Sequence, residues 1–160
     1  VPQIGGYFSD LSTEDNLNAV GEILIIDPKL RKMKIEELIF KFELDAVRKV
    51  EAKFLSGGMK RRLVISMALL GEPEILLMDE PLAALDPQTI QMLQTIIIRL
   101  QSEYNLTILI TDHQARDLLV VCDRAVILSN SKIVAEGTPN QLMKNEDATK
   151  YYFGDNFKFK

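Results

Sequence analysis

Two adjacent acids, Asp79 and Glu80, end an apolar run at residues 75–78. Burying an acid at a strand end is costly unless the acid is used, and ligands of parallel sheets gather at the carboxyl ends of the strands. Nucleotide hydrolysis is one reaction that needs a group to hold a metal ion and a second group to orient or deprotonate water. This acid pair therefore predicts Asp79 as a ligand of Mg²⁺, held through water, and Glu80 as a general base, in preference to a helix cap before Pro81.

A second candidate site is the glycine turn, formed by Ser56, Gly57 and Gly58. Ser56 is a good N-cap, and the residues after the turn predict a helix that is basic at first and then apolar. The glycines let a ligand approach the backbone, and the helix N-terminus offers unpaired N–H groups and a positive dipole end. The turn therefore predicts anion binding. The basic run at residues 60–62 is either a solvated helix face or a long-range assist to a bound phosphate.

A single histidine, His113, comes just after a second apolar run, at residues 107–111. A lone histidine is more often structural than functional. This one follows Thr111 and Asp112 at a strand end, downstream of the acid pair, and we therefore expect it to hydrogen-bond a phosphate.

These side chains need helices and strands to position them. Besides Ser56, capping residues stand at four more predicted helix starts, at Ser12, Asp27, Asp86 and Thr138. Strands that alternate with helices indicate an α/β domain with a mainly parallel sheet. The other predicted elements are buried strands at 75–81 and 107–111, a short helix at 114–121, and a strand pair at 124–128 and 132–136 that turns at 129–131.

Composition excludes several classes of protein. The chain has 160 residues, 26% of them charged and 47% hydrophobic, which is typical of a globular domain with one sizeable core. Its net charge of −4 gives no reason to expect nucleic-acid binding, and Cys122, the single cysteine, rules out a disulfide framework within the chain. No apolar run approaches the eighteen or so residues of a membrane span, and no signal-peptide pattern opens the sequence, so we expect a cytoplasmic protein.

In their order and spacing, these elements resemble the second half of an ABC-type ATPase. The glycine turn, with Leu55 before it and Met59 after it, looks like the signature loop of that family. The acid pair looks like the Walker B pair. The other matches extend the resemblance from the start of the chain to the histidine: Gln3 looks like the Q-loop glutamine, Asp86 like the D-loop acid and His113 like the switch histidine.

The resemblance implies that ATP and Mg²⁺ are the cofactors. It assigns Glu80 and His113 to catalysis, with His113 on the γ-phosphate, and Gln3 to contacts with the metal and the attacking water. It also implies a second copy of the ATPase, paired head to tail, so that the glycine turn closes on ATP held by the other subunit and Asp86 couples the two sites. Met59 stands where the family commonly has Gln, and its side chain cannot supply that polar contact.

The implied fold is a P-loop NTPase-like (RecA-like) α/β core with a parallel sheet and a small helical subdomain. About residues 8–72 would form the helical subdomain with the signature motif, and about residues 73–160 the remainder of the catalytic core and the C-terminal tail. The sequence contains no Gly-x-x-x-x-Gly-Lys-Ser/Thr, the phosphate-cradling P-loop or Walker A motif. We therefore expect a partial ABC ATPase domain, truncated on its N-terminal side and inactive by itself.

Several stretches resemble more narrowly the ATPases of lipopolysaccharide export in Gram-negative bacteria. Residues 110–114 place Asp between Thr and His, which is less usual across ABC ATPases, and residues 153–157 read aromatic-Gly-Asp-x-Phe. The alternatives are an ATPase of another transporter, such as a branched-chain amino-acid importer, and a non-hydrolysing scaffold without a P-loop. DNA-repair and chromosome-structuring ATPases need long coiled coils, and the sequence has no heptad run.

This branch implies transmembrane permease subunits as partners. Their coupling helix would enter a groove on the helical subdomain, with Tyr7, Phe8 and Leu11 as candidate groove residues that suit a core role equally well. No nucleic-acid partner and no direct membrane insertion are expected. The expected location is cytoplasmic and peripheral, on the cytoplasmic face of the inner membrane.

Overall fold

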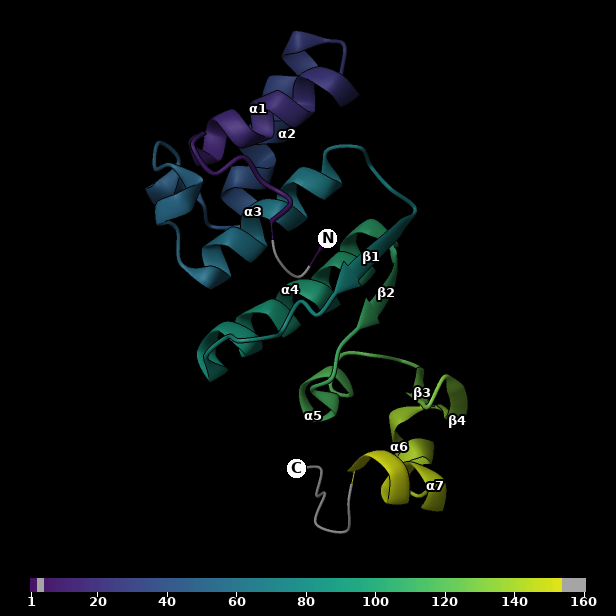
Figure 1. Cartoon of the computed structure of the whole chain (residues 1–160). Coiled ribbons are helices and arrows are strands. Elements are labelled where there is room, and N and C mark those ends of the chain that lie inside the picture. Colours follow the sequence, from purple (N-terminus) through teal and green to yellow (C-terminus); the bar gives the residue numbers. More distant parts are fainter. Residues whose placement is uncertain (3–4, 154–160) are drawn as a thin grey trace. The chain divides into compact units, whose positions relative to one another are not determined.

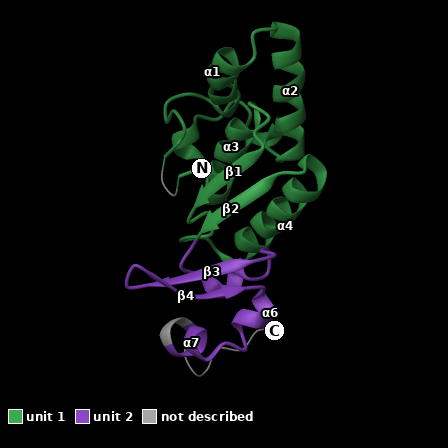
Figure 2. Ribbon diagram, turned by 90° about the vertical axis from the view of Figure 1, so that its right-hand side faces the viewer, with its two compact units in different colours: residues 1–111 green, residues 112–160 purple. Residues whose placement is uncertain are grey.

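The computed structural model describes residues 1–2 and 5–153. Gln3, the predicted metal and water contact, lies outside the described residues, and so do residues 154–160 of the tail. The chain forms two compact units, Val1–Thr111 and Asp112–Lys160 (Figure 2). The subdomain boundary that we predict near residue 72 falls inside the first unit and stays a prediction.

Helices of the first unit begin where the sequence places capping residues. Ser12 accepts a hydrogen bond from the backbone N–H of Asp15 at 3.1 Å, and Asp27 accepts one from that of Lys29 at 2.8 Å. These bonds satisfy N–H groups that have no partner inside a helix, and the predicted starts are confirmed. The helices of this unit are α1 (Thr13–Leu24), α2 (Pro28–Lys41), α3 (Gly57–Leu69) and α4 (Pro87–Tyr104), with 3₁₀ turns at Asp45–Val47 and Ala52–Phe54 (Figure 1).

The core of the first unit surrounds α3. Helix α1 packs against both α2 and α3, and the side chains of Leu17, Ile39, Leu63 and Ile65 are almost completely buried among them. Burying one such aliphatic side chain contributes about 1.5–3 kcal/mol. This packing fixes α3 firmly, and α3 carries the glycine turn at its N-terminus.

The sheet of the first unit is one parallel pair. Strand β1 (Ile75–Asp79) lies beside β2 (Thr107–Thr111), and α4 connects the two along the chain. Their register pairs Asp79 with Thr111, so both strands end at the same edge. Parallel strands need such a long crossover connection, which the sequence pattern predicts correctly.

Among the described residues, helices of the first unit cover one face of this strand pair and leave the other open. Leu76 and Met78 are buried, whereas Ile75, Leu77 and Leu109 on the other face are 58–60% exposed. The prediction of buried strands is therefore wrong for this outer face. Because side chains alternate along a strand, every second one points to the outer face. No described segment of the unit covers these outer side chains.

The second unit is a small antiparallel pair with short helices. Its core consists mainly of Leu119, Ile127, Ala135 and Leu142. The predicted helix start at Thr138 is confirmed by a capping box with Gln141, and the strand pair forms as predicted, whereas the predicted helix at 114–121 is only four residues long. The elements are α5 (Ala115–Leu118), β3 (Ala125–Ser129), β4 (Lys132–Gly137), α6 (Pro139–Leu142), α7 (Glu146–Ala148) and a π-turn at Thr149–Phe153.

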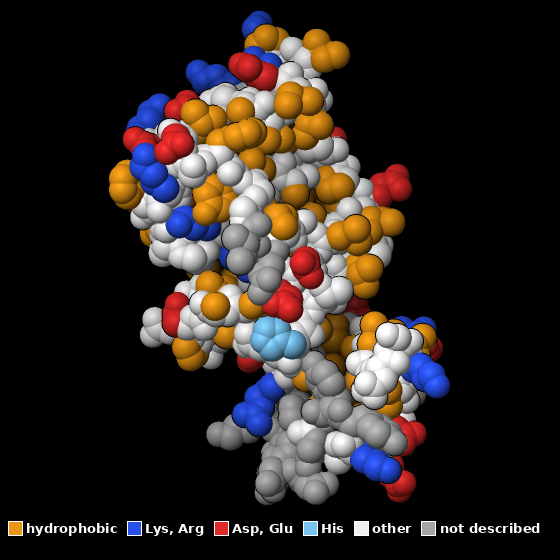
Figure 3. Space-filling model, viewed as in Figure 1, with side chains coloured by type: hydrophobic (Ala, Val, Ile, Leu, Met, Phe, Trp, Pro, Cys, Tyr) orange, Lys and Arg blue, Asp and Glu red, His pale blue; other side chains and the backbone are white. Residues whose placement is uncertain are grey.

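Exposed apolar side chains gather over α1 and α2, at the top of the view in Figure 3. Ile23, Ile26 and Met33 are among them. Within the described residues, none of the helices combines the length and the apolar character that crossing a membrane requires.

Candidate functional site

The acid pair lies at the carboxyl edge of the parallel strands, where the sequence pattern places it. Asp79 is the last residue of β1 and is exposed. The hydroxyl of Thr111, at the end of β2, donates a hydrogen bond of 2.7 Å to Oδ1 of Asp79. The other carboxylate oxygen of Asp79, Oδ2, accepts no hydrogen bond in the part of the chain that the structure describes.

Glu80, the second acid, has an unusual backbone that is held at both of its peptide groups. Its φ of 42° lies in the left-handed region, which costs a non-glycine residue about 1–3 kcal/mol. Its N–H donates to the carbonyl of Thr111 at 2.7 Å. Its own carbonyl accepts from the N–H of Ala83 at 3.2 Å and from the Arg61 guanidinium at 3.0 Å. The backbone of Glu80 is thus held by neighbours from three segments.

The basic run of α3 is mostly inside the protein. Arg61 and Arg62 are each only 9% exposed, so the prediction of a solvated helix face is wrong for both. Arg61 donates to backbone carbonyls of Pro2 and Glu80, and Arg62 donates to the carbonyl of Phe42. Buried guanidinium groups need such acceptors because burying an unsatisfied charge is expensive.

Ser56, the first residue of the glycine turn, caps α3 as predicted. Its hydroxyl accepts a hydrogen bond from the backbone N–H of Met59 at 3.3 Å, while Ser56 and Gly57 stay exposed. The exposed helix end offers N–H groups and a positive dipole end to an anion.

The two glycines also permit close packing within the chain. A Cβ placed on Gly57 would lie 3.2 Å from a methyl of Leu85, and one on Gly58 would lie 2.6 Å from Cγ2 of Thr89. The second distance is shorter than carbon atoms tolerate, so only glycine fits at position 58 without a shift of its neighbour. The glycine turn therefore lies directly against the N-terminus of α4.

Asp86 caps that N-terminus. Its carboxylate accepts hydrogen bonds from the backbone N–H groups of Gln88 and Thr89, both at 3.0 Å, and from the Thr89 hydroxyl at 2.5 Å. The Thr89 hydroxyl, followed by these N–H groups, holds the pKa of Asp86 below its usual range. The predicted helix cap is confirmed, and the carboxylate remains at the exposed surface beside the glycine turn.

His113 belongs to the second unit. Its imidazole is 66% exposed, and Nδ1 lies 3.9 Å from a carboxylate oxygen of Asp112, whose side chain is completely buried. The ring thus lies beside a buried carboxylate while most of it stays at the surface. The predicted phosphate contact of His113 stays a prediction.

The acid pair suits magnesium chemistry. Mg²⁺ prefers oxygen ligands and commonly binds through one or two carboxylates together with waters and substrate phosphates. Asp79 offers one such exposed carboxylate, with its orientation fixed by Thr111. Within residues 1–2 and 5–153, no three His, Cys, Asp or Glu side chains form a metal-holding group.

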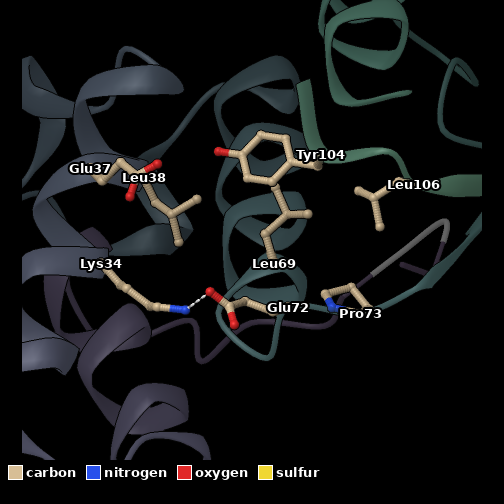
Figure 4. Close-up of a pocket in the computed structure, with 8 residues that line it drawn as sticks. All are labelled: Lys34, Glu37, Leu38, Leu69, Glu72, Pro73, Tyr104 and Leu106. Carbon is tan, nitrogen blue, oxygen red and sulfur yellow. Dashed lines mark hydrogen bonds and ion pairs between the residues drawn. The ribbon is translucent and has the colours of Figure 1, made fainter. Parts of the chain in front are cut away.

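A cavity of about 250 Å³ lies elsewhere in the first unit, between α2, the end of α3 and the end of α4 (Figure 4). Leu38, Leu69 and Leu106 line it, and an ion pair of Lys34 with Glu72 stands at its rim. None of the predicted site residues lines this cavity, so it belongs to a different part of the surface.

Sequence reasoning missed three residues of the site. Arg61 appears in the sequence only as part of a basic run, and Thr89 as an ordinary helix residue. Thr111 alone carried a signal, since a polar side chain that ends an apolar strand beside a carboxylate is a candidate donor. The partners of Arg61 lie 59 and 19 residues away in the chain, and no local pattern reveals such bonds.

The chain is similar in sequence to known proteins. A family model described as ABC transporter matches residues 1–83, which include the glycine turn and the acid pair. The chain is 40% identical over 159 residues to the lipopolysaccharide export system ATP-binding protein LptB of Haemophilus influenzae, and 36% identical to the protein of the same name from Escherichia coli K12. Each match covers 99% of this chain and 66% of the relative, so the chain spans just under two thirds of their length.

A solved structure shows the same fold. CbiO1 from Clostridium perfringens, described as part of the ABC transporter complex cbiONQ, superposes with a TM-score of 0.79 at 22% identity. The match covers 90% of this chain and 57% of that one. At this identity the likeness concerns the fold, and the α/β architecture with a parallel strand pair is confirmed.

Proposed function

Because the chain belongs to the ABC transporter family of ATP-binding proteins, we propose that it supplies the hydrolytic acids of an ATPase subunit that powers transport. One observation carries the proposal: Asp79 and Glu80 stand together at the carboxyl edge of the strands, one oriented through its carboxylate and the other through its backbone. Ligands of parallel sheets collect at this edge.

In the proposed reaction each acid has its own role. Mg²⁺, when bound with ATP, supplies neutralisation of the charge that develops on the phosphate oxygens. Asp79 would hold the ion, through water, with the carboxylate oxygen that does not bond to Thr111. Glu80 accepts a proton from the attacking water as general base. His113 and Gln3 complete the proposal as contacts to the γ-phosphate and to the metal and water, respectively.

The phosphate cradle must come from outside these 160 residues, since no P-loop motif occurs in them. The P-loop backbone and its lysine supply most contacts to the β- and γ-phosphates. We therefore expect the 160 residues by themselves to show no ATP turnover. Measurable hydrolysis by this chain alone, abolished by Glu80→Gln, would contradict this part of the proposal.

The glycine turn acts on a second subunit in this proposal. Its N–H groups and dipole end suit a γ-phosphate, and the turn is exposed at Ser56 and Gly57. A head-to-tail dimer would bring the P-loop nucleotide of one copy onto the glycine turn of the other. Asp86, exposed beside the turn, would then lie close to that interface.

The proposed cargo is lipopolysaccharide. Two relatives of that export system are 40% and 36% identical to this chain over nearly its whole length. Partner permeases would dock near Phe8 and Leu11, whose side chains are exposed and so are available to a partner. The protein would then work on the cytoplasmic face of the inner membrane.

The central test uses Glu80→Gln in a longer protein that contains these 160 residues together with a P-loop, called here the P-loop-containing protein. We expect it to bind Mg-ATP normally and to accumulate as an ATP-bound dimer, with turnover at least about 100-fold lower, because such bases typically supply that much. Glu74→Gln, one residue before the start of the same strand, is the matched control. Turnover of Glu80→Gln within about threefold of wild type would remove Glu80 from the role of base.

The cargo needs a separate test. The P-loop-containing protein should restore growth to a Gram-negative strain depleted of its own lipopolysaccharide-export ATPase. An active ATPase that fails to restore growth would point to another transporter, such as an amino-acid importer, and a protein without turnover would point to a scaffold.

A further inference from the structure

Arg61 joins three segments that are far apart in the chain. It lies one turn into α3, and its side chain is almost fully buried. Nη1 donates a hydrogen bond of 2.7 Å to the carbonyl of Pro2, and Nη2 donates one of 3.0 Å to the carbonyl of Glu80. One guanidinium thus connects the helix of the glycine turn to the residue before Gln3 and to the proposed base.

A hydrogen bond to the carbonyl of Glu80 helps to keep the backbone of this residue in place. Glu80 keeps a left-handed backbone, with a φ of 42°, which non-glycine residues retain only when their surroundings hold them there. The N–H side of the residue is fixed by the carbonyl of Thr111, and the carbonyl side by Ala83 and Arg61. Because the backbone sets the direction of the Cα–Cβ bond, a donor to this carbonyl helps to aim the carboxylate.

Lysine could not replace the guanidinium here. The two carbonyls belong to different segments, and each is met by its own nitrogen of a planar fork. A lysine ammonium is a single nitrogen on a flexible stem, and it cannot hold both acceptors in that fixed geometry. The site therefore uses the shape of arginine as well as its charge.

We propose that Arg61 is a positioning residue for hydrolysis, which acts through the backbone of Glu80. The inference rests on the proposed function, because it takes Glu80 as the general base. In this role Arg61 would act through that backbone, without a direct contact to the nucleotide. Its loss should lower kcat while leaving the affinity for ATP unchanged, since the P-loop supplies most of the nucleotide contacts.

The neighbouring Arg62 gives a matched control. It lies on the same helix, is equally buried, and donates to the carbonyl of Phe42 at 3.0 Å and to the carboxylate of Glu43 at 3.3 Å. Both of these acceptors belong to the helical part of the unit and lie outside the acid pair. Arg62→Lys should therefore destabilise the fold in a similar way without redirecting Glu80.

The experiment compares Arg61→Lys and Arg62→Lys in the P-loop-containing protein. Urea midpoints report stability, calorimetry reports ATP binding without Mg²⁺, and steady-state kinetics give kcat and KM for Mg-ATP. We expect Arg61→Lys to lower kcat by about ten- to a hundredfold, the usual effect of a small misplacement of a reacting group, with KM changed by less than about threefold. Arg62→Lys should keep kcat within about twofold at a comparable urea midpoint.

A double variant separates a positioning role from a general loss of structure. In a Glu80→Gln background, Arg61→Lys should change the residual rate by less than about twofold, because residues that act as a unit are non-additive. Equal kcat losses in the two arginine variants, or fully additive losses in the double variant, would overturn the proposal. A wild-type protein without turnover would overturn the proposed function itself, which is a different result from wild-type turnover that Arg61→Lys leaves intact.

Discussion

The Thr111 hydroxyl donates a hydrogen bond of 2.7 Å to Oδ1 of Asp79 across the parallel strand pair. The two residues are also register partners at the end of their strands. A carboxylate held in this way presents its other oxygen in one direction, which is how outer-shell hydrogen bonds tune metal sites.

Removing the hydroxyl should weaken the binding of magnesium. Thr111→Val keeps the shape of the side chain, and we expect the Mg²⁺ concentration for half-maximal ATP hydrolysis to rise by about tenfold or more. Thr107→Val, at the other end of β2 and also exposed, is the control and should leave the Mg²⁺ requirement unchanged. Equal Mg²⁺ curves for both variants would rule out this role for Thr111.

Gly58→Ala should destabilise the wild-type protein but not a variant that lacks the Thr89 methyl. In the wild type the new methyl meets Cγ2 of Thr89 at 2.6 Å. Overpacking of this kind costs about 1–3 kcal/mol, against at most about 1 kcal/mol gained from the helix propensity of Ala. Thr89→Ser removes Cγ2 but keeps a hydroxyl for Asp86, so in that background Gly58→Ala should be neutral or stabilising. Urea unfolding of the four proteins tests this, and loss of stability in both backgrounds would contradict it.

Asn16→Asp should destabilise the segment that carries Phe8. Asn16 is fully buried, and its amide donates to the carbonyls of Phe8, Leu11 and Ser12 at 2.9–3.1 Å. A carboxylate would face these three oxygens without a proton to donate, at a cost of about 3 kcal/mol. The control is Asn18→Asp, which loses one donor to Glu14 at a partly exposed position.

That control should cost less than about 1 kcal/mol. Hydrogen exchange at residues 8–12 gives a local readout, and we expect faster exchange only in Asn16→Asp. Similar losses of stability in the two variants would show that the buried amide has no special role.

Acid should weaken the cap of α4. The pKa of Asp86 in the folded protein is depressed, chiefly by the Thr89 hydroxyl, so its charged form stabilises the fold above the unfolded pKa of about 3.9. That contribution is lost as pH falls through the folded pKa. Asp86→Asn should therefore have a lower urea midpoint than wild type at pH 7, and the difference should shrink below about pH 4. A difference that stays constant down to pH 2.5 would argue against a charged cap.

Helix starts were predictable because their signals are local. Ser56 and Asp86 each accept hydrogen bonds from backbone N–H groups two or three residues ahead. Donor and acceptor are therefore close neighbours in the sequence. The parallel direction of β1 and β2 was also predictable, because strands that alternate with helices indicate a parallel sheet and α4 is the crossover that such strands need.

Burial and long-range bonds were not predictable in this way. Leu77 and Leu109 were expected inside because apolar runs usually are, but which face of a strand is covered depends on segments elsewhere. Arg61 was expected at the surface because of its charge, and its carbonyl partners became visible only in three dimensions. Side-chain identity fixes what a residue can bond, and the fold decides which partner is near.

Helix α4 contacts a different helix at each of its two ends. One end, at Thr89, bears on Gly58, and the other end, at Tyr104, accepts a hydrogen bond of 2.8 Å from Lys41 of α2. Its 18 residues span about 27 Å. One helix thus links the glycine turn, at its first turn, to the end of α2, at its last residue.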